Sequence, residues 1–261
     1  MILRWHGTAA LTIESGGLTL AVDPFVGMPL GVSDSERLSG ERARIFREAD
    51  AVLVTHGHFD HIYDIPALYG GSGTPIYATE TPMDTLRENG VSEDSLRLLT
   101  PPQSVMIGDI KVTAYRSRHC VFDAAVIFKT ATRPLTLRHP ARLLELLRLN
   151  KAYPENGETV MYEIESDGCR LQIMGSMGMA DGADYPAGAD MLVLPFQGTG
   201  DPAKTVAPIV ERLRPKRILL DHYDDAFPPM SARIRTEAFE HKMTAAGVPT
   251  EAMRTDRKYS I

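Results

Sequence analysis

Cysteine is scarce in this sequence: the chain contains only Cys120 and Cys169, and they do not form a CxxC pair. Two cysteines are too few for a disulfide framework, so we expect the chain to work in a reducing compartment. Long apolar runs are also missing, as is a positively charged N-terminal segment followed by an apolar one. These absences predict a cytoplasmic protein without a membrane span.

The sequence also lacks a long block of basic residues. Its 28 Lys and Arg residues stand against 34 Asp and Glu residues, which gives a formal net charge of -6. We therefore expect a small organic substrate and no nucleic-acid partner. Neither a GxGxxG motif nor a P-loop occurs, and we find no internal repeat. The sequence leaves open whether the chain forms a homo-oligomer.

Apolar residues, by contrast, make up 43% of the 261 positions, enough for the core of one large domain, which we predict over residues 1–261. Apolar runs and turn dipeptides predict strands over 2–5, 10–14, 18–22, 51–54, 76–78, 104–107, 111–115, 160–165, 170–174, 191–194 and 217–221. Helical patterns cover 41–48, 65–69, 82–89, 141–149, 202–213 and 231–246. Strands and helices alternate in both halves, which indicates an α+β fold with two packed sheets covered by helices.

Two segments interrupt this alternation. Residues 25–39 are rich in Gly, Pro and Ser without a period, and we expect a functional loop there. Residues 131–158 include a basic stretch, 133–151, with leucines at 143, 144, 146, 147 and 149. We interpret this segment as a helical insert. Its leucines suit packing, and a basic, leucine-rich lid would also suit an amphiphilic substrate.

A cluster of potential metal ligands follows the predicted strand 51–54. The window His56-Gly57-His58-Phe59-Asp60-His61 places three imidazoles and one carboxylate within six residues. Cations such as Zn²⁺ accept both kinds of ligand, so the window predicts a metal site. Alternate side chains on an extended turn converge, so we expect His56 and His58 to share one cation and Asp60 and His61 to face a second. Gly57 suits a tight turn around an ion.

Three further candidates lie at strand ends elsewhere: Asp23 after 20–22, His119 after 114–118, and His222 after 218–221. Strand ends that converge on one rim can hold metal ligands rigidly and leave positions open for water and substrate. We therefore expect these side chains to meet the HxHxDH window.

This set of residues resembles the metallo-β-lactamase-fold hydrolases, and within them the branch that contains L-ascorbate-6-phosphate lactonase. The resemblance extends essentially from end to end of the chain. It implies a four-layer αββα sandwich in which two mixed β-sheets are covered by helices. It also implies that His56, His58 and His119 hold one metal ion and that Asp60, His61 and His222 hold another. Asp23 would orient a ligand histidine through a hydrogen bond.

The chain departs from this family pattern at Ser176. Many members carry an aspartate that bridges both metal ions after an apolar strand, whereas this chain has Gly175-Ser176-Met177. A neutral hydroxyl is a poorer ligand than a carboxylate, which leaves open whether one or two ions bind. Asp181 or Asp184 could replace the bridge if the loop folds back, or a hydroxide alone could bridge. Zn²⁺ is the expected ion, and Mn or Fe are alternatives for the same ligands.

The expected function is metal-dependent hydrolysis of a lactone, ester or similar bond in a small metabolite. A metal lowers the pKa of bound water from about 15.7 to about 7 and so supplies a metal-bound hydroxide. Asp60 is the candidate catalytic residue that orients this hydroxide and collects its proton. A substrate anion could be held by Arg116, by Arg118 or by arginines of the insert. The alternatives are a phosphodiesterase of the same fold, and a non-catalytic metal-binding sensor or scaffold that has lost the bridging aspartate.

Overall fold

Two mixed β-sheets form the centre of the computed structural model, which describes residues 1–29, 32–121, 128, 130 and 132–261. The first sheet has the order β15-β1-β2-β3-β4-β5-β6. Its strands are β1 Ile2–Trp5, β2 Leu11–Ser15, β3 Leu18–Val22, β4 Ala51–Leu53, β5 Ile76–Ala78, β6 Leu96–Leu98 and β15 Lys258–Ser260. The part from β15 to β3 is antiparallel, and the part from β3 to β6 is parallel.

The second sheet has the order β11-β8-β9-β10-β12-β13-β14, and β7 also pairs with β8. Its strands are β7 Gln103–Ile107, β8 Ile110–Arg118, β9 Val160–Ser166, β10 Cys169–Met174, β11 Gly178–Met179, β12 Met191–Pro195, β13 Ile218–Asp221 and β14 Thr250–Ala252. An antiparallel part, from β7 to β10, again continues into a parallel part, from β10 to β14. Residues 2–98 together with β15 therefore build the first mixed sheet, and residues 103–252 build the second.

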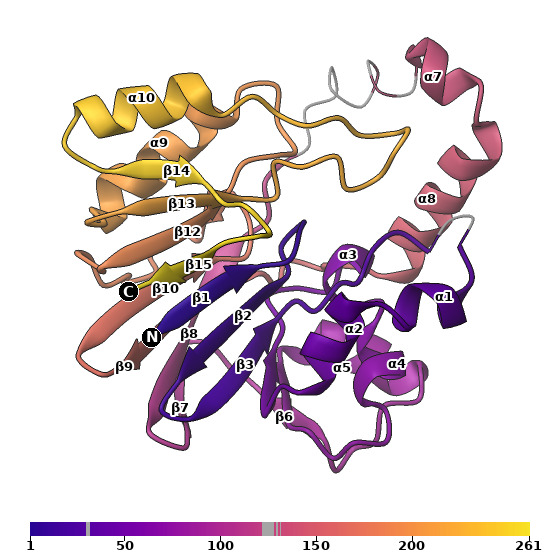
Figure 1. The fold of residues 1–261 in the computed structure, drawn as a ribbon, viewed down its shortest axis with the longest axis horizontal. Coiled ribbons are helices and arrows are strands. Elements are labelled where there is room, and N and C mark those ends of the chain that lie inside the picture. Colours follow the sequence, from indigo (N-terminus) through magenta and orange to yellow (C-terminus); the bar gives the residue numbers. More distant parts are fainter. Residues whose placement is uncertain (30–31, 122–127, 129, 131) are drawn as a thin grey trace.

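Helices cover the outer side of both sheets. The helices of the described residues are α1 Asp34–Leu38, α2 Glu41–Arg47, α3 Phe59–Ile62, α4 Ile65–Tyr69, α5 Glu80–Glu88, α7 Pro134–Leu137, α8 Pro140–Ala152, α9 Pro202–Leu213 and α10 Glu237–Ala245, of which α7 and α8 lie away from the sheets. In Figure 1, α9 and α10 lie beside β12–β14, whereas α2, α4 and α5 lie beyond β3–β6. The prediction of two mixed sheets covered by helices is confirmed.

The core explains this layering. One apolar cluster joins residues from the two sheets, such as Leu11 and Ile13 of β2 with Ile164 of β9. A second cluster lies between the first sheet and its helices and includes Val52 of β4 and Phe46 of α2. Strands buried on both faces read as continuous apolar runs, which is why β4, β12 and β13 were predictable from sequence.

The predicted strands are confirmed to within a few residues, but two predictions for other segments are wrong. The last helix begins at Glu237, not at 231, because the Ser231 backbone N–H and side chain bond to the turn at residues 225–227. The predicted loop 25–39 contains the helix α1, whose first turn is capped by Ser33. Residues 30–31 of this loop and residue 131 of the predicted insert lie outside the described residues. The rest of the predicted insert holds α7 and α8, and its status as an insert stays a prediction.

No helix within the described ranges is both long enough and apolar enough to cross a membrane.

Candidate metal centre

The HxHxDH window connects β4 to α3. β4 is an inner strand of the first sheet, between β3 and β5, and is completely buried. His58 is the residue before α3, with an extended backbone, and Asp60 and His61 lie in the helix itself. The change from extended chain to helix inside the window lets side chains that are close in sequence point in different directions.

The structure brings the six predicted ligands together in two groups of three. His56, His58 and His119 form one group, and Asp60, His61 and His222 form the other; within each group the potential ligand atoms lie within 4.8 Å of one another. We call them the three-histidine cluster and the aspartate cluster. The grouping is the one that the family resemblance implied.

The two clusters are neighbours. The ring centroids of His56 and His61, one from each cluster, are 3.9 Å apart. In the three-histidine cluster the His119 ring lies 5.0 Å from that of His56 and 4.5 Å from that of His58. In the aspartate cluster His222 Nε2 lies 3.1 Å from Asp60 Oδ2. One site therefore contains all six side chains.

Most of these histidines are oriented by a contact at Nδ1. His61 Nδ1 lies 2.7 Å from Asp23 Oδ2, His119 Nδ1 lies 2.9 Å from the Cys120 carbonyl, and His222 Nδ1 lies 3.3 Å from Gln197 Oε1. Because a carboxylate, a carbonyl and an amide oxygen accept hydrogen bonds, each of these imidazoles carries a proton on Nδ1, which leaves Nε2 as the nitrogen available to a metal ion. Such partners are typical of histidines that bind metals.

Asp23 is the centre of a hydrogen-bond network behind the ligands. Thr55 donates to it twice, from its backbone N–H to Oδ1 at 2.8 Å and from its hydroxyl to Oδ2 at 2.6 Å. The Thr55 hydroxyl also lies 3.1 Å from His56 Nδ1. Asp23 thus has the orienting position that the resemblance implied. Thr55 was not among the predicted site residues, although its place directly before the window was a signal for it.

Backbone strain is found at two of the site residues. Asp23 and His222 adopt left-handed conformations, with φ of 45° and 51°. Such conformations cost residues other than glycine about 1–3 kcal/mol, and they concentrate at functional sites. Backbone hydrogen bonds hold both residues in place, from Asp23 N–H to the Leu53 carbonyl and from His222 N–H to the Thr8 carbonyl, each at 3.0 Å.

Burial keeps the three-histidine cluster neutral. It lowers the pKa of His56 well below the usual value, and the charges of neighbouring histidines add to this effect. Burial also lowers the pKa of His58 to about 4, against the opposing charge of Asp60, and it lowers the pKa of His119. Neutral imidazole is the form that binds a metal, so these side chains are ready to bind one at neutral pH.

The aspartate cluster has the opposite electrostatic character. Burial would raise the pKa of Asp60, but the charges of His61 and His222 outweigh burial, so the pKa lies below its usual value. Burial would lower the pKa of His222, but the hydrogen bond and the charge of Asp60 raise it to about 9. His61 and His222 therefore stabilise the negative charge of the Asp60 carboxylate.

These residues fit a divalent cation. The donor set consists of imidazole nitrogens and one carboxylate, which are ligands of Zn²⁺ and similar ions. Asp221, directly before His222, is 2% exposed, and its Oδ1 has no hydrogen-bond partner among the described residues. Burial raises the pKa of Asp221 to about 7. A cation held by His222 would offset the charge of this buried carboxylate.

Ser176 lies next to the three-histidine cluster. It is buried, and its Oγ accepts a hydrogen bond of 3.0 Å from the Cys120 backbone N–H, directly after His119. The alternative that Asp181 or Asp184 replaces a bridging aspartate is wrong. Both carboxylates are exposed and form ion pairs with arginines, Asp181 with Arg118 and Asp184 with Arg212.

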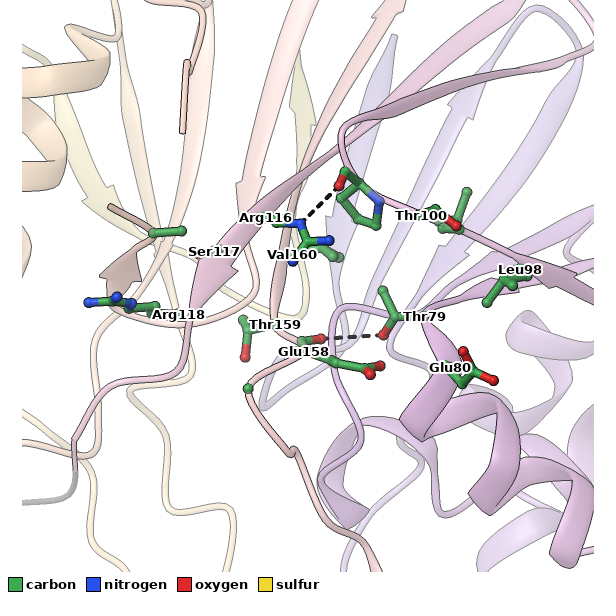
Figure 2. A pocket seen from close by; sticks show the side chains of 14 residues that line it. Thr79, Glu80, Leu98, Thr100, Arg116, Ser117, Arg118, Glu158, Thr159 and Val160 are labelled. Atoms are coloured by element: carbon green, nitrogen blue, oxygen red, sulfur yellow. Dashed lines mark hydrogen bonds between the residues drawn. The ribbon is translucent and has the colours of Figure 1, made fainter. Parts of the chain in front are cut away.

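One further histidine and the two arginines proposed for a substrate anion belong to neither cluster. His6 is a core histidine, since it is 7% exposed and its Nε2 lies 2.8 Å from Thr12 Oγ1. Arg116 and Arg118 line a pocket of about 310 Å³ between the ends of β5 and β6 and strands β8 and β9. Figure 2 shows the Arg116 side chain bonded to the Pro101 carbonyl within it. None of the described lining residues is one of the six predicted ligands, so the pocket is distinct from the metal centre.

Relatives in other organisms are described as metal-dependent hydrolases. A UPF0173 metal-dependent hydrolase of Pyrobaculum arsenaticum is 24% identical over 261 residues, which covers 97% of this chain and 100% of the relative. Another, from a Polaromonas species, is 27% identical over 229 residues and covers 84% of this chain and 76% of the relative.

Solved structures show a similar fold at low sequence identity. Igni18, a metallo hydrolase from Ignicoccus hospitalis, has a TM-score of 0.64 and 17% identity, with 100% of this chain and 98% of that chain covered. The metallo-beta-lactamase fold protein YhfI from Bacillus subtilis has a TM-score of 0.60 and 14% identity, with 99% of each chain covered.

A family model described as the beta-lactamase superfamily domain matches residues 2–222 of this chain. The matched range includes all six predicted ligands as well as Asp23 and Ser176. The comparisons support the fold and the wider family, and the lactonase branch stays a prediction. The chain belongs to the beta-lactamase superfamily domain family and has the metallo-β-lactamase fold.

Proposed function

We propose that this chain is a metal-dependent hydrolase that cleaves a lactone or other ester bond of a small metabolite. The observation that carries the proposal is the meeting of the three-histidine and aspartate clusters in one site, with His56 and His61 in ring contact. The names of the relatives support the same reaction class. The acidic chain favours a small substrate over a nucleic acid.

His56, His58 and His119 would hold one cation, and Asp60, His61 and His222 would hold the other. A divalent ion would supply Lewis acidity for the bond that breaks and would lower the pKa of water. Zn²⁺ suits this ligand set best, and Mn or Fe are alternatives.

Asp60 is the proposed proton acceptor. Its pKa lies below the usual value, so its carboxylate is ionised throughout the neutral range. It is 6% exposed and borders both His61 and His222, so it lies where a water bound in the site can reach it. A carboxylate in this position can orient the attacking water and take its proton.

The test compares Asp60→Asn with Asp181→Asn, since Asp181 is an exposed carboxylate in a surface ion pair. Each protein is loaded with Zn²⁺, Mn²⁺ or Fe²⁺, its metal content is verified, and hydrolysis of lactone, ester and phosphodiester panels is measured. We expect lactone or ester hydrolysis that falls about 10²- to 10⁴-fold in Asp60→Asn and is unchanged in Asp181→Asn. Absence of any hydrolysis by metal-loaded protein would contradict the proposal.

Two other outcomes identify the alternatives. Hydrolysis of phosphodiesters without hydrolysis of lactones or esters would make the chain a phosphodiesterase. A sensor or scaffold would bind metal without turnover, and Ser176→Asp would then increase the number of bound ions without producing activity. High activity of the unaltered chain would exclude the sensor.

A further inference from the structure

The helix α8 exposes leucines on the side that faces away from the protein. Leu144 and Leu147 are 56% and 55% exposed, and Arg148 and Lys151 are exposed as well. These four residues have the spacing i, i+3, i+4 and i+7, so they share one face of the helix. We call them the outer face of α8. Leucines in such numbers on a surface require an explanation, because contiguous exposed apolar patches mark interaction sites.

The opposite face of α8 is already occupied. Leu146 and Leu149 pack against the apolar cluster between the first sheet and its helices. The chain then continues to Tyr153, which is buried and whose ring lies 5.7 Å from that of Tyr63, just after α3. The helix is thus anchored by its inner face, and the leucines of the outer face are additional to those that the fold uses.

The apolar surface continues into α7, which contacts α8. Leu135 and Leu137 are 44% and 65% exposed. In Figure 1, α7 and α8 stand at the outside of the molecule, away from both sheets. The described part of the segment therefore presents several leucines on two consecutive helices.

The charge of this segment is opposite to that of the whole chain. Residues 133–151 contain five basic residues and one acidic residue, a net charge of +4, whereas the remaining residues carry -10. Arg138, Arg148 and Lys151 are exposed, and no carboxylate of the described residues forms an ion pair with them. Basic and apolar side chains together on one helix face are suited to the boundary between the charged headgroups and the acyl chains of a lipid layer.

We propose that the outer face of α8, together with α7, docks on an anionic lipid surface. Leu144 and Leu147 would enter the apolar boundary, while Arg148 and Lys151 would extend to the headgroups. A second copy of the chain is a poorer occupant, because a twofold contact would place this positive segment against itself. The proposal concerns binding alone and does not depend on the proposed hydrolase function.

The test is co-sedimentation of the whole protein with vesicles. One set contains equal parts of phosphatidylglycerol and phosphatidylcholine, and the other contains phosphatidylcholine alone. We expect binding to the anionic vesicles that weakens with added salt, and weaker binding to the neutral ones. The double variant Leu144→Ser/Leu147→Ser and the double variant Arg148→Glu/Lys151→Glu should each bind the anionic vesicles at least about tenfold more weakly.

The matched control is Leu98→Ser/Met106→Ser, which removes two apolar side chains that are 48% and 61% exposed on β6 and β7. It should bind like the unaltered chain, and circular dichroism and metal content verify that all variants fold. No binding by the unaltered chain, or equal binding by the leucine variant, overturns the proposal. The proposal is also overturned if sedimentation shows that the unaltered chain is a dimer and the leucine variant is a monomer, because the outer face would then bind a second copy.

Discussion

His61 and Asp23 form a buried pair: His61 Nδ1 lies 2.7 Å from Asp23 Oδ2, and the side chains are 2% and 1% exposed. Burial would lower the pKa of His61, but the charges of Asp23 and Asp60 overcome this effect and raise it. The pair connects the end of β3 to the first turn of α3, so it links the sheet to the aspartate cluster. An imidazole oriented in this way is a stronger metal ligand than one without such a partner.

Replacing this partner should weaken metal binding. In Asp23→Asn the side chain keeps its shape but loses the charge, and we expect metal affinity at the aspartate cluster to fall about 10- to 100-fold. Competition with a chromophoric chelator measures this affinity. Asp50→Asn is the control, because Asp50 also accepts a hydrogen bond from a backbone N–H, that of Thr19 in β3, but is exposed. Equal affinities of both variants would show that Asp23 does not support the site.

Thr55 should contribute to stability through its hydroxyl. Thr55→Val keeps the shape of the side chain but removes the donor to Asp23 Oδ2 inside a buried site. We expect the free energy of unfolding to fall by about 1–3 kcal/mol, whereas Thr55→Ser, which keeps the hydroxyl, should lose less. Urea unfolding of the metal-free proteins checks this order, and a Ser variant that is as unstable as the Val variant would refute the role of the hydroxyl.

Gly57 should tolerate no side chain. A Cβ at this position would lie 2.1 Å from the Pro154 carbonyl oxygen, so Gly57→Ala must separate the metal window from the segment that follows α8. We expect a loss of stability of several kcal/mol, about the size of a severe core substitution, together with weaker metal binding. Gly71→Ala is the control, because no atom lies within 4 Å of its added Cβ. Thermal unfolding and chelator competition should separate the two variants, and similar behaviour would contradict the expectation.

His6 should make stability depend on pH. Burial, with a smaller effect from the charges of Arg42 and Arg4, lowers its pKa to about 4, compared with 6.5 for the ordinary residue. Between these values the unfolded chain binds a proton at His6 that the folded chain does not bind. The contribution of neutral His6 to the free energy of unfolding is therefore present above pH 6.5 and is lost as the pH falls towards 4. The loss is about 2 kcal/mol between pH 6.5 and pH 5.

The measurement is urea unfolding of metal-free protein at these two pH values. His6→Gln keeps a polar group near Thr12 but does not titrate. Between the two pH values its free energy of unfolding should therefore fall by about 2 kcal/mol less than that of the unaltered chain. Other titrating groups affect both proteins equally. If both proteins lose the same stability between pH 6.5 and pH 5, the pKa of His6 in the folded chain is not lowered.

Much of the fold could be predicted because its strands are buried on one or both faces. β12 and most of β13 are continuous apolar runs, and a Gly-Asp dipeptide, which is typical of turns, lies between β7 and β8. Short strands such as β6 and β14 were missed, since three residues carry too little pattern for recognition. The start of the last helix was placed too early because side-chain bonds of Ser231 to a turn compete with the helix there.

The ligand candidates could be predicted because each of them follows a strand or lies in one dense window. Their partners could not, because those contacts join residues that are distant in sequence. Thr55 bonds to Asp23 across two strands, and His222 Nδ1 contacts Gln197 from another loop. Gly57 was predicted for a tight turn around an ion, but the structure gives a different reason, the close approach of Pro154. Only the three-dimensional arrangement shows such an approach.

The most direct test of the metal centre is elemental analysis of the purified protein combined with anomalous diffraction at the absorption edge of the metal found. We expect one or two ions per chain, with density bonded to the three-histidine cluster, to the aspartate cluster, or to both. A metal-loaded crystal without anomalous density at either cluster, or with its ions bound elsewhere, would show that these six residues do not form a metal centre.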